Sequence, residues 1–508
     1  MSFESILYLK ENPINDNEEM PKYFNDLHLD QIINNITLGK QEYNLKPFFF
    51  KPLNNLDEIL YRHEIMKDLE NQNLFSKVKE FCENMSTIRN KLEEMSRLNY
   101  ELQKDSCFLD IIEFYCNSVE NFVWNLMDIE IKSSGFKKFL EYVKEYIKSE
   151  EFAILKIDFI DLKEKLLKVK YCLSIKSNCV KIKKYENEKD YNIEIEEVFK
   201  KFIQDSNKDY KYKFNSSLYM NHVEAKILEI VSILYPDIFE TIKEYRIKNK
   251  EFQDIKIKEF DREVQFYMCY LEYIKRFKRI NLNFCYPEVS TENKEIFIKD
   301  GFDLSLSEKL INQDMPIVCN DFYFKNNERI FVISGPNQGG KTTFARMFGQ
   351  LHYLSAIGCP IPGSSGKMFL FDNIFTHFER EEDIKTLNGK LQDDLIRIHD
   401  TLIKSTPKSI IIMNEIFSST TLHDAIFLGK EIMNKIIKLD ALCVFVTFAY
   451  ELADIDDKVV SMVSAVIPEN NNSRTFKIIR KDSDGLAYAI SLVEKYHLTY
   501  KCLKERIL

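Results

Sequence analysis

A glycine-rich loop between an apolar run and a helical pattern constrains the fold of this chain more than any other segment. The sequence GPNQGGKT at 335–342 fits the pattern G-x-x-x-x-G-K-[ST]. Residues 330–333 are all apolar and read as a strand, and a helical pattern follows from Thr343. A strand that turns directly into a helix is the context in which this pattern binds phosphate. The sequence therefore predicts a phosphate-binding loop at this turn.

Each residue type in the loop has a physical role in holding a nucleotide. The glycines let backbone N–H groups turn inward and surround phosphate at a helix N-terminus. Lys341 is expected to reach the β- and γ-phosphates, and the Thr342 hydroxyl to bind Mg²⁺. We therefore predict ATP and Mg²⁺ as cofactors. The predicted nucleotide-binding residues are Gly335, Pro336, Asn337, Gln338, Gly339, Gly340, Lys341, Thr342 and Thr343.

A second pair of polar residues stands at the end of another apolar run. Residues 410–413 read as a buried strand that ends in Asn414 and Glu415. In proteins with this kind of loop, an acidic residue at such a strand end holds the magnesium shell, and a following glutamate polarises the attacking water. We predict Thr342 and Asn414 as metal-site residues, with Asn414 acting as a neutral amide towards a metal-bound water. We predict Glu415 as the catalytic residue.

The residue pattern divides the chain into two parts. From Pro316 onward, short apolar runs alternate with longer helical stretches, which predicts an α/β fold with a mostly parallel sheet. Residues 1–300 read as mostly helical, and their clearest apolar stripe has spacings of four and three. We therefore predict a helical domain over 1–300 and a nucleotide-binding domain over 301–508. The stripe consists of Leu74, Val78, Phe81, Met85, Ile88, Leu92 and Met95.

One segment of the helical part has a strand pattern. Apolar and polar residues alternate over 171–175 and again over 180–182, with a turn-forming Ser-Asn pair between them. This predicts a small hairpin near 169–184. The segment is rich in lysine, which is typical either of a solvated face or of a patch that contacts DNA phosphates. The candidate DNA contacts are Lys170, Lys176, Lys181, Lys183 and Lys184.

Net charge, cysteine content and the distribution of apolar residues indicate which binding sites and which cellular compartment to expect. The net charge of −9 means that any DNA contact must come from local basic patches. The 11 cysteines are scattered without a C-x-x-C pair, which argues against a disulfide framework or a zinc site. The N-terminus does not read as a signal peptide, and no uncharged apolar run has membrane-spanning length. We therefore expect a cytoplasmic protein without a membrane segment.

Several segments together resemble the MutS family of DNA mismatch-repair ATPases. The run SGPNQGGKTT at 334–343 resembles the family signature TGPNMGGKST, and IMNEIFSSTTLHD at 412–424 resembles the block LMDEIGRGTSTYDG. The remaining segments that resemble family motifs lie at 357–362, 372–377 with Glu382 and Asp383, 447–452 and 485–489, and more loosely at 52–62 and 283–287.

The resemblance implies an architecture and a set of partners. It implies a P-loop ATPase domain of the ABC type, preceded by a long-helix lever and core domain and followed by a helical dimerisation segment. It also implies a homodimer with composite ATP sites that closes around DNA. Family members that read mismatches carry two further domains ahead of the lever, one with a Phe-x-Glu wedge. Too few residues precede the lever-like start to form them, so we expect that mismatches are not read by that route.

Three positions depart from the family pattern. Asn414 stands where the family has aspartate, and Phe448 where it has a histidine that senses the γ-phosphate. Gly389 falls about where a family serine contacts ATP in the other subunit. Losing a charged metal partner and a γ-phosphate contact affects hydrolysis more than binding. The resemblance therefore implies tight nucleotide binding with slow or partner-dependent hydrolysis.

Three functions fit these observations. The first is an ATP-dependent DNA-binding protein of the MutS mismatch-repair type, a nucleotide-gated homodimeric clamp with weak ATPase activity. The second is an ATP switch that acts on RNA or a ribosome, as another branch of the family is thought to do. The third is a non-hydrolysing structural dimer held together by ATP, which Asn414 and Phe448 favour and Glu415 disfavours.

Overall fold

The chain forms two compact units in a computed structural model. The helical unit comprises Met1–Phe3, Asn71–Ile131 and Lys137–Asp261, and the sheet unit comprises Glu4–Glu70, Lys132–Phe136 and Arg262–Leu508. The sequence predicted a boundary near residue 300, whereas backbone contacts group residues 4–70 and 262–300 with the C-terminal region. The structure describes residues 3–10, 18–176, 179–188, 191–200, 220–379, 389–417, 419–467, 470–482 and 504.

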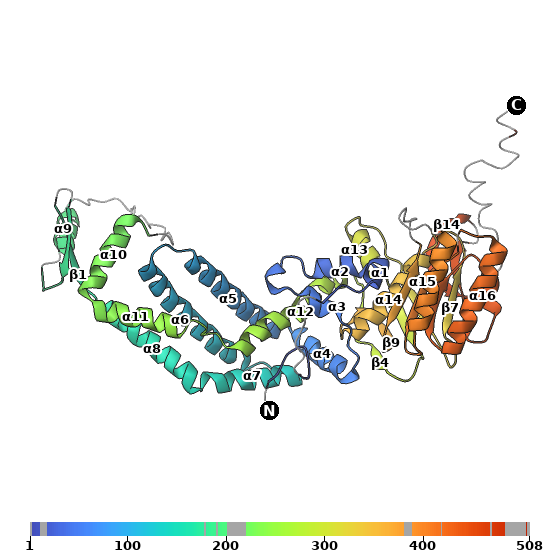
Figure 1. Cartoon of the computed structure of the whole chain (residues 1–508), viewed down its shortest axis with the longest axis horizontal. Helices are drawn as coiled ribbons and strands as arrows, with labels where there is room; N and C mark the ends of the chain where they lie inside the picture. Colours follow the sequence, from blue (N-terminus) through green and yellow to red (C-terminus); the bar gives the residue numbers. More distant parts are fainter. Residues whose placement is uncertain are drawn as a thin grey trace. The chain divides into compact units, whose positions relative to one another are not determined.

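Long amphipathic helices make up most of the helical unit (Figure 1). The predicted apolar stripe lies on α5 (Gln72–Ser96), which buries Leu74, Val78 and Phe81. The side chain of Asn71 accepts a hydrogen bond from the Asn73 N–H and so caps the start of this helix. The other helices of this unit are α6 (Glu101–Leu126), α7 (Ser134–Ile147), α8 (Glu150–Leu167), α9 (Tyr191–Lys200), α10 (His222–Leu234), α11 (Pro236–Lys248) and the first turns of α12 (Ile255–Lys278).

Aromatic side chains form the centre of the helical unit. Phe139 on α7 stacks on Phe260 on α12, with ring centroids 3.6 Å apart and planes inclined by 10°. Phe122 on α6 lies 5.9 Å from Phe139 and 4.3 Å from Phe81. All four rings are at most 2% exposed. Burial of rings of this size supplies much of the stability of a helical bundle.

A two-stranded antiparallel ladder extends the helical unit. Strand β1 (Tyr171–Lys176) pairs with β2 (Cys179–Lys184), and Ile175 lies opposite Val180. Because side chains alternate across a strand, Lys176, Lys181 and Lys183 project from one face and the apolar residues from the other. These strands lie within the segment for which the sequence predicted a hairpin.

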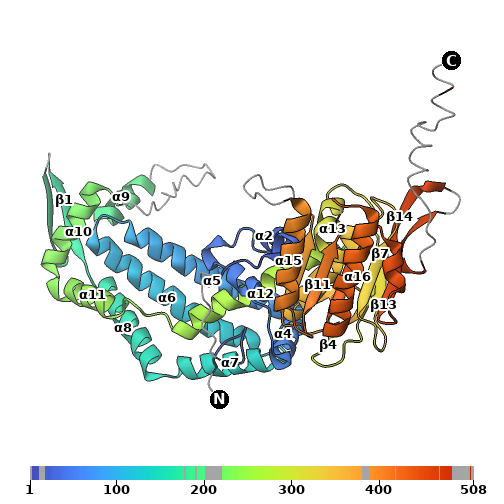
Figure 2. The same cartoon turned by 45° about the vertical axis from the view of Figure 1, so that its right-hand side comes forward.

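A six-stranded, mostly parallel sheet organises the sheet unit, as the sequence predicted (Figure 2). Five strands run parallel and β14, at one edge, is antiparallel to its neighbour. The strand order is β10 (Ile374–Phe378), β11 (Ile410–Asn414), β12 (Leu442–Val446), β7 (Ile330–Ser334), β13 (Val459–Ile467) and β14 (Asn470–Arg480).

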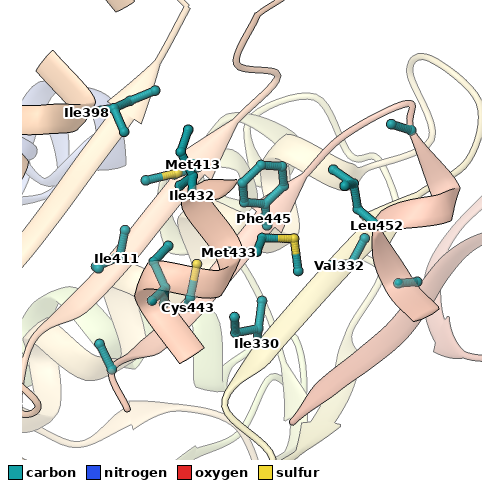
Figure 3. Close-up of a cluster of buried hydrophobic side chains, with 14 of the residues drawn as sticks. Ile330, Val332, Ile398, Ile411, Met413, Ile432, Met433, Cys443, Phe445 and Leu452 are labelled. Carbon is teal, nitrogen blue, oxygen red and sulfur yellow. The ribbon is translucent and has the colours of Figure 1, made fainter. Parts of the chain in front are cut away.

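Both faces of the central strands are buried by helices. On one face, Val332, Met413 and Phe445 pack against side chains of α15 (Lys390–Lys404) and α16 (Leu422–Leu439), as Figure 3 shows. On the other face lies α14 (Lys341–Ala356), which the strands contact through alternate residues. Burial on both faces explains why these strands read as continuous apolar runs in the sequence.

The first helices of the chain pack against α14. Leu27, at the end of α1 (Tyr23–Leu27), contacts Gly349 so closely that a Cβ there would lie 2.7 Å from its side chain. The Gln350 side chain donates a hydrogen bond of 2.9 Å to the Leu27 carbonyl. This contact explains why the N-terminal residues belong to the sheet unit. The other helices in this part of the chain are α2 (Leu29–Ile36), the 3₁₀ helix η1 (Gln41–Tyr43), α3 (Lys46–Phe50) and α4 (Leu56–Leu69).

Smaller elements complete the sheet unit. A four-stranded sheet has the order β4 (Glu288–Ser290), β9 (Ser365–Phe369), β5 (Phe297–Gly301) and β6 (Asn320–Tyr323). A second pair joins β3 (Phe284–Cys285) to β8 (Ile361–Pro362). The remaining helices are α13 (Leu304–Ile311) and the 3₁₀ helix η2 (Tyr450–Asp454). Within the described ranges, no helix combines the length and apolar character needed to cross a bilayer.

Candidate nucleotide-binding site

The glycine-rich loop joins the buried strand β7 to the N-terminus of α14. Its backbone takes left-handed conformations at Gly335, Gln338 and Gly340, with φ values of 121°, 59° and 92°. Gly339 is required for a different reason, because a Cβ there would overlap the Ser464 hydroxyl of β13. That hydroxyl donates a hydrogen bond of 2.8 Å to the Gly339 carbonyl. The loop is therefore held from β13 at a position where a side chain cannot fit.

Lys341, the first residue of α14, is folded back over the loop and is 4% exposed. Its Nζ donates hydrogen bonds to the carbonyl oxygens of Gly335 (3.0 Å) and Pro336 (3.1 Å) and to Asn337 Oδ1 (3.3 Å). Burial lowers the pKa of this amine, and the Glu415 carboxylate, 3.8 Å away, opposes the shift. The loop thus holds one buried cation, which a phosphate group would stabilise.

Thr342, Asn414 and Glu415 meet at the carboxyl edge of the sheet. The Thr342 hydroxyl donates a hydrogen bond of 3.0 Å to Asn414 Oδ1, at the end of β11. Glu415 follows with φ of 54°, and its N–H donates to the Val446 carbonyl at the end of β12. Two adjacent oxygen atoms suit Mg²⁺, which prefers oxygen ligands. The predicted metal and catalytic residues therefore lie together beside the loop.

Phe448 and Gly389 occupy different parts of the sheet unit. The Phe448 ring, just beyond β12, has its centroid 4.5 Å from the Lys341 Nζ and is 48% exposed. Gly389 is the N-cap of α15, and among the described residues a Cβ there would meet no atom within 4 Å. Phe448 thus lies beside Lys341, whereas Gly389 marks the start of α15.

The candidate DNA-binding lysines belong to the helical unit, not to this site. Lys170, Lys176, Lys181, Lys183 and Lys184 are all exposed. The ammonium group of Lys183 pairs with the Glu188 carboxylate, and Lys184 lies 5.0 Å from the centre of the Tyr235 ring. Lys176 and Lys181 share a face of the hairpin with Lys183. The structure therefore presents a small basic face on β1 and β2.

Sequence reasoning missed two residues that border the loop. Ser464 binds the Gly339 carbonyl from β13, and the Phe476 carbonyl on β14 would lie 3.4 Å from a Cβ at Gly340. Both residues stand more than a hundred positions after the loop, in strands without a distinctive motif. The loop also depends on the pairing of β13 with β7, which local patterns do not encode.

Comparison with known proteins agrees with this geometry. Residues 331–504 match the family model described as MutS domain V. The chain is similar to the DNA mismatch repair protein MutS of Orientia tsutsugamushi (strain Boryong), with 26% identity over 216 residues, 42% of this chain and 24% of that protein. It is similar to the DNA mismatch repair protein MSH3 of Kluyveromyces lactis, with 29% identity over 185 residues, 36% of this chain and 18% of that protein.

A third relative is the DNA mismatch repair protein MutS of Bacillus thuringiensis (strain Al Hakam), with 28% identity over 200 residues, 39% of this chain and 22% of that protein. These matches span a quarter or less of the length of the relatives. Fold and site define a mixed α/β protein with a glycine-rich loop at the carboxyl edge of a mostly parallel sheet. Over residues 331–504 the chain is similar to domain V of the MutS family.

Proposed function

We propose that this chain is an ATP-dependent DNA-binding protein of the MutS mismatch-repair type, a nucleotide-gated homodimeric clamp with weak ATPase activity. The observation that carries the proposal is the meeting of Lys341, Thr342, Asn414 and Glu415 at one edge of the sheet. The relatives are named as DNA mismatch repair proteins, and they support the choice of DNA as the partner.

The residues around the loop fit a nucleotide with Mg²⁺. The first N–H groups of α14 are oriented for an anion, because a helix N-terminus carries partial positive charge. Lys341 would exchange its hydrogen bonds to Gly335 and Pro336 for phosphate oxygens. Thr342 and Asn414 would hold Mg²⁺, which neutralises phosphate charge when bound. The loop and the end of β11 together supply the groups for this P-loop ATPase site.

Weak hydrolysis follows from the residues at the ends of β11 and β12. Glu415 is 24% exposed at its side chain and can orient a water molecule. Asn414 brings no charge to the metal shell, and Phe448 brings no proton to the phosphate. We therefore propose that nucleotide binding, more than turnover, changes the state of the protein, by stabilising one conformation over another.

DNA contacts are proposed for the basic face of β1 and β2. Lys176 and Lys181 project from the face that also carries Lys183. Phosphate contacts of exposed lysines supply affinity without base specificity, which suits binding by DNA shape. Lys170 precedes β1 and Lys184 lies on the opposite face, beside Tyr171. The full set of proposed DNA contacts is Lys170, Lys176, Lys181, Lys183 and Lys184. The long helices of the helical unit would act as the lever that carries this face, in a cytoplasmic homodimer.

Asn414 and Phe448 also favour a second function, a non-hydrolysing dimer held together by nucleotide. An uncharged metal partner and an apolar ring near Lys341 both reduce hydrolysis without removing the phosphate loop. The retained Glu415 favours the first function. Turnover by the purified protein, with and without DNA, distinguishes the two.

The experiment that tests the main proposal measures binding to fluorescent duplex, mismatched, branched and single-stranded DNA, without nucleotide and with saturating ATP–Mg²⁺. We expect at least one of these to bind, with an affinity that ATP shifts. The variant Lys341→Ala should lose the shift and keep the nucleotide-free affinity. If none of the DNA molecules binds at low salt in either state, the DNA function is wrong, and an RNA or protein partner takes its place.

A further inference from the structure

The surroundings of the Lys341 amine differ on its two sides. On the side of the loop, the amine meets Gly335, Pro336 and Asn337, next to the N–H groups that begin α14. The charge of Arg474 also acts on Lys341 from β14, the strand that borders Gly340. The groups on this side that attract phosphate oxygens are the N–H groups at the start of α14, the Lys341 amine and the charge of Arg474.

On the side of β11 and β12, the Lys341 amine is next to a carboxylate and an aromatic ring. Glu415 places a carboxylate oxygen 3.8 Å from Nζ, and Phe448 places its ring 4.5 Å from it. Neither side chain donates a hydrogen bond when the carboxylate is ionised. The face of a phenyl ring is electron-rich, which attracts the lysine cation and repels a phosphate oxygen.

Hydrogen bonds on both sides of Phe448 fix the course of its backbone. The Thr447 N–H donates to the Ile333 carbonyl of β7 (3.0 Å), which ties this residue to the neighbouring strand. The Ala449 N–H donates to the Thr447 hydroxyl (3.0 Å), and Ala449 is 3% exposed. Phe448 therefore stands between two anchored neighbours and projects its side chain towards Lys341.

We propose that this site prefers a nucleoside diphosphate to the corresponding triphosphate, and that Phe448 sets the preference. The inference rests on the proposed nucleotide-binding function. Two phosphates find donors in the loop and in the first turn of α14, and Lys341 would reach the β- and γ-phosphates. A third phosphate adds negative charge beside the Glu415 carboxylate and meets the Phe448 ring where a donor is needed to stabilise it. The neutral Asn414 offsets less of this charge through the metal shell than a carboxylate ligand would.

The test compares the affinities of a fluorescent ADP and a fluorescent, slowly hydrolysed ATP analogue, both with Mg²⁺, for the full chain. Phe448→His keeps an aromatic side chain of similar size and adds a donor. Phe427→His is the matched control, because Phe427 lies on α16, is 61% exposed and has no part in the proposed site. Thermal unfolding of each variant checks that it is folded, which the exposure of both side chains favours.

We expect the unaltered chain to bind the diphosphate at least tenfold more tightly than the triphosphate analogue. Phe448→His should reduce this ratio to threefold or less by strengthening triphosphate binding, and Phe427→His should leave the ratio unchanged. Equal affinities in the unaltered chain, or an unchanged ratio in Phe448→His, would overturn the inference but leave nucleotide binding intact. If neither nucleotide binds, the proposed nucleotide function fails together with the inference.

Discussion

The candidate nucleotide-binding edge of the sheet unit and the basic face of β1 and β2 carry most of the proposed function, and they differ in how they are built. Lys341 is 4% exposed, and its position is set by buried strands on either side of the loop. On the hairpin, by contrast, even Ile175 is 71% exposed, and the lysines lie at the surface. The edge of the sheet holds a few functional groups in place by tight packing, whereas the basic face of β1 and β2 exposes positively charged side chains to solvent.

The difference predicts how each region responds to substitution. A site that depends on fixed geometry loses function when the scaffold shifts, because its groups act together. A basic face that contacts phosphates loses a small, nearly equal part of its affinity with each lysine. Substitutions in the scaffold should therefore have large effects, and substitutions on the hairpin small ones.

The largest expected effect comes from Phe445, which is 1% exposed beneath the site on β12. Phe445→Ala should lower the free energy of unfolding by about 3–5 kcal/mol and weaken nucleotide binding several-fold, because it leaves a cavity under the strand that leads to Phe448. Denaturant titration and nucleotide fluorescence measure the two quantities. Phe139→Ala, in the helical unit, is the control and should cost similar stability with unchanged nucleotide affinity. If Phe139→Ala also lost nucleotide binding, the folding of the helical unit would affect the nucleotide site of the sheet unit.

Gly339→Ala should have the next largest effect, confined to the loop. The added methyl group overlaps the Ser464 hydroxyl and would lie 2.9 Å from the Pro336 carbonyl oxygen, so the loop must shift. We expect nucleotide affinity to fall about a hundredfold, roughly 2.7 kcal/mol, with little change in the unfolding of the helical unit. Adding Ser464→Ala should restore part of the affinity. Isothermal titration of the single and double variants gives the result, and an unaffected Gly339→Ala would contradict the geometry of the loop.

Acid should destabilise the sheet unit through two buried histidines. Burial lowers the pKa of both His63 and His352 to about 4. Both side chains are neutral above their ordinary pKa of 6.5, but below it the unfolded chain takes up protons that the folded chain does not. Stability is therefore lost as the pH falls from 6.5 towards 4, by about 2 kcal/mol for each histidine at pH 5. Denaturant titrations at pH 7.5 and 5.0 measure the loss, which His352→Gln should reduce. An equal loss in that variant would show that His352 does not cause it.

The glycine-rich loop could be predicted from the sequence because all of its characteristic residues lie within one short segment. Glycines, Lys341 and Thr342 stand at fixed spacings, and the strand and helix that flank them have clear periodicities. The mostly parallel sheet was predictable for the same reason, since continuous apolar runs mark strands that are buried on both faces. The roles assigned to Asn414, Glu415 and the lysines remain predictions.

The residues that the sequence did not reveal act across long separations. Ser464 supports Gly339 from 125 positions away, and nothing in its own strand marks it. Leu27 packs on Gly349 of α14, which assigns the first helices to the sheet unit although their periodicity resembles that of the helical region. Such contacts depend on the tertiary fold, whereas a pattern in one segment shows only which of its faces is buried.

The smallest expected effect tests the hairpin. Lys181→Ala should change the free energy of unfolding by less than about 0.5 kcal/mol, because the side chain is exposed. If Lys181 contacts a DNA phosphate, the slope of log affinity against log salt should fall by about 0.9, since one fewer counterion is released. Lys226→Ala on α10 is the control, because Lys226 pairs with Glu229 at 2.8 Å and lies outside the proposed face. Binding measured by anisotropy across a salt series gives both slopes. Equal slopes in all three proteins would remove Lys181 from the DNA contacts, whereas a change confined to Lys181→Ala would show that the hairpin contributes to DNA affinity through its charge.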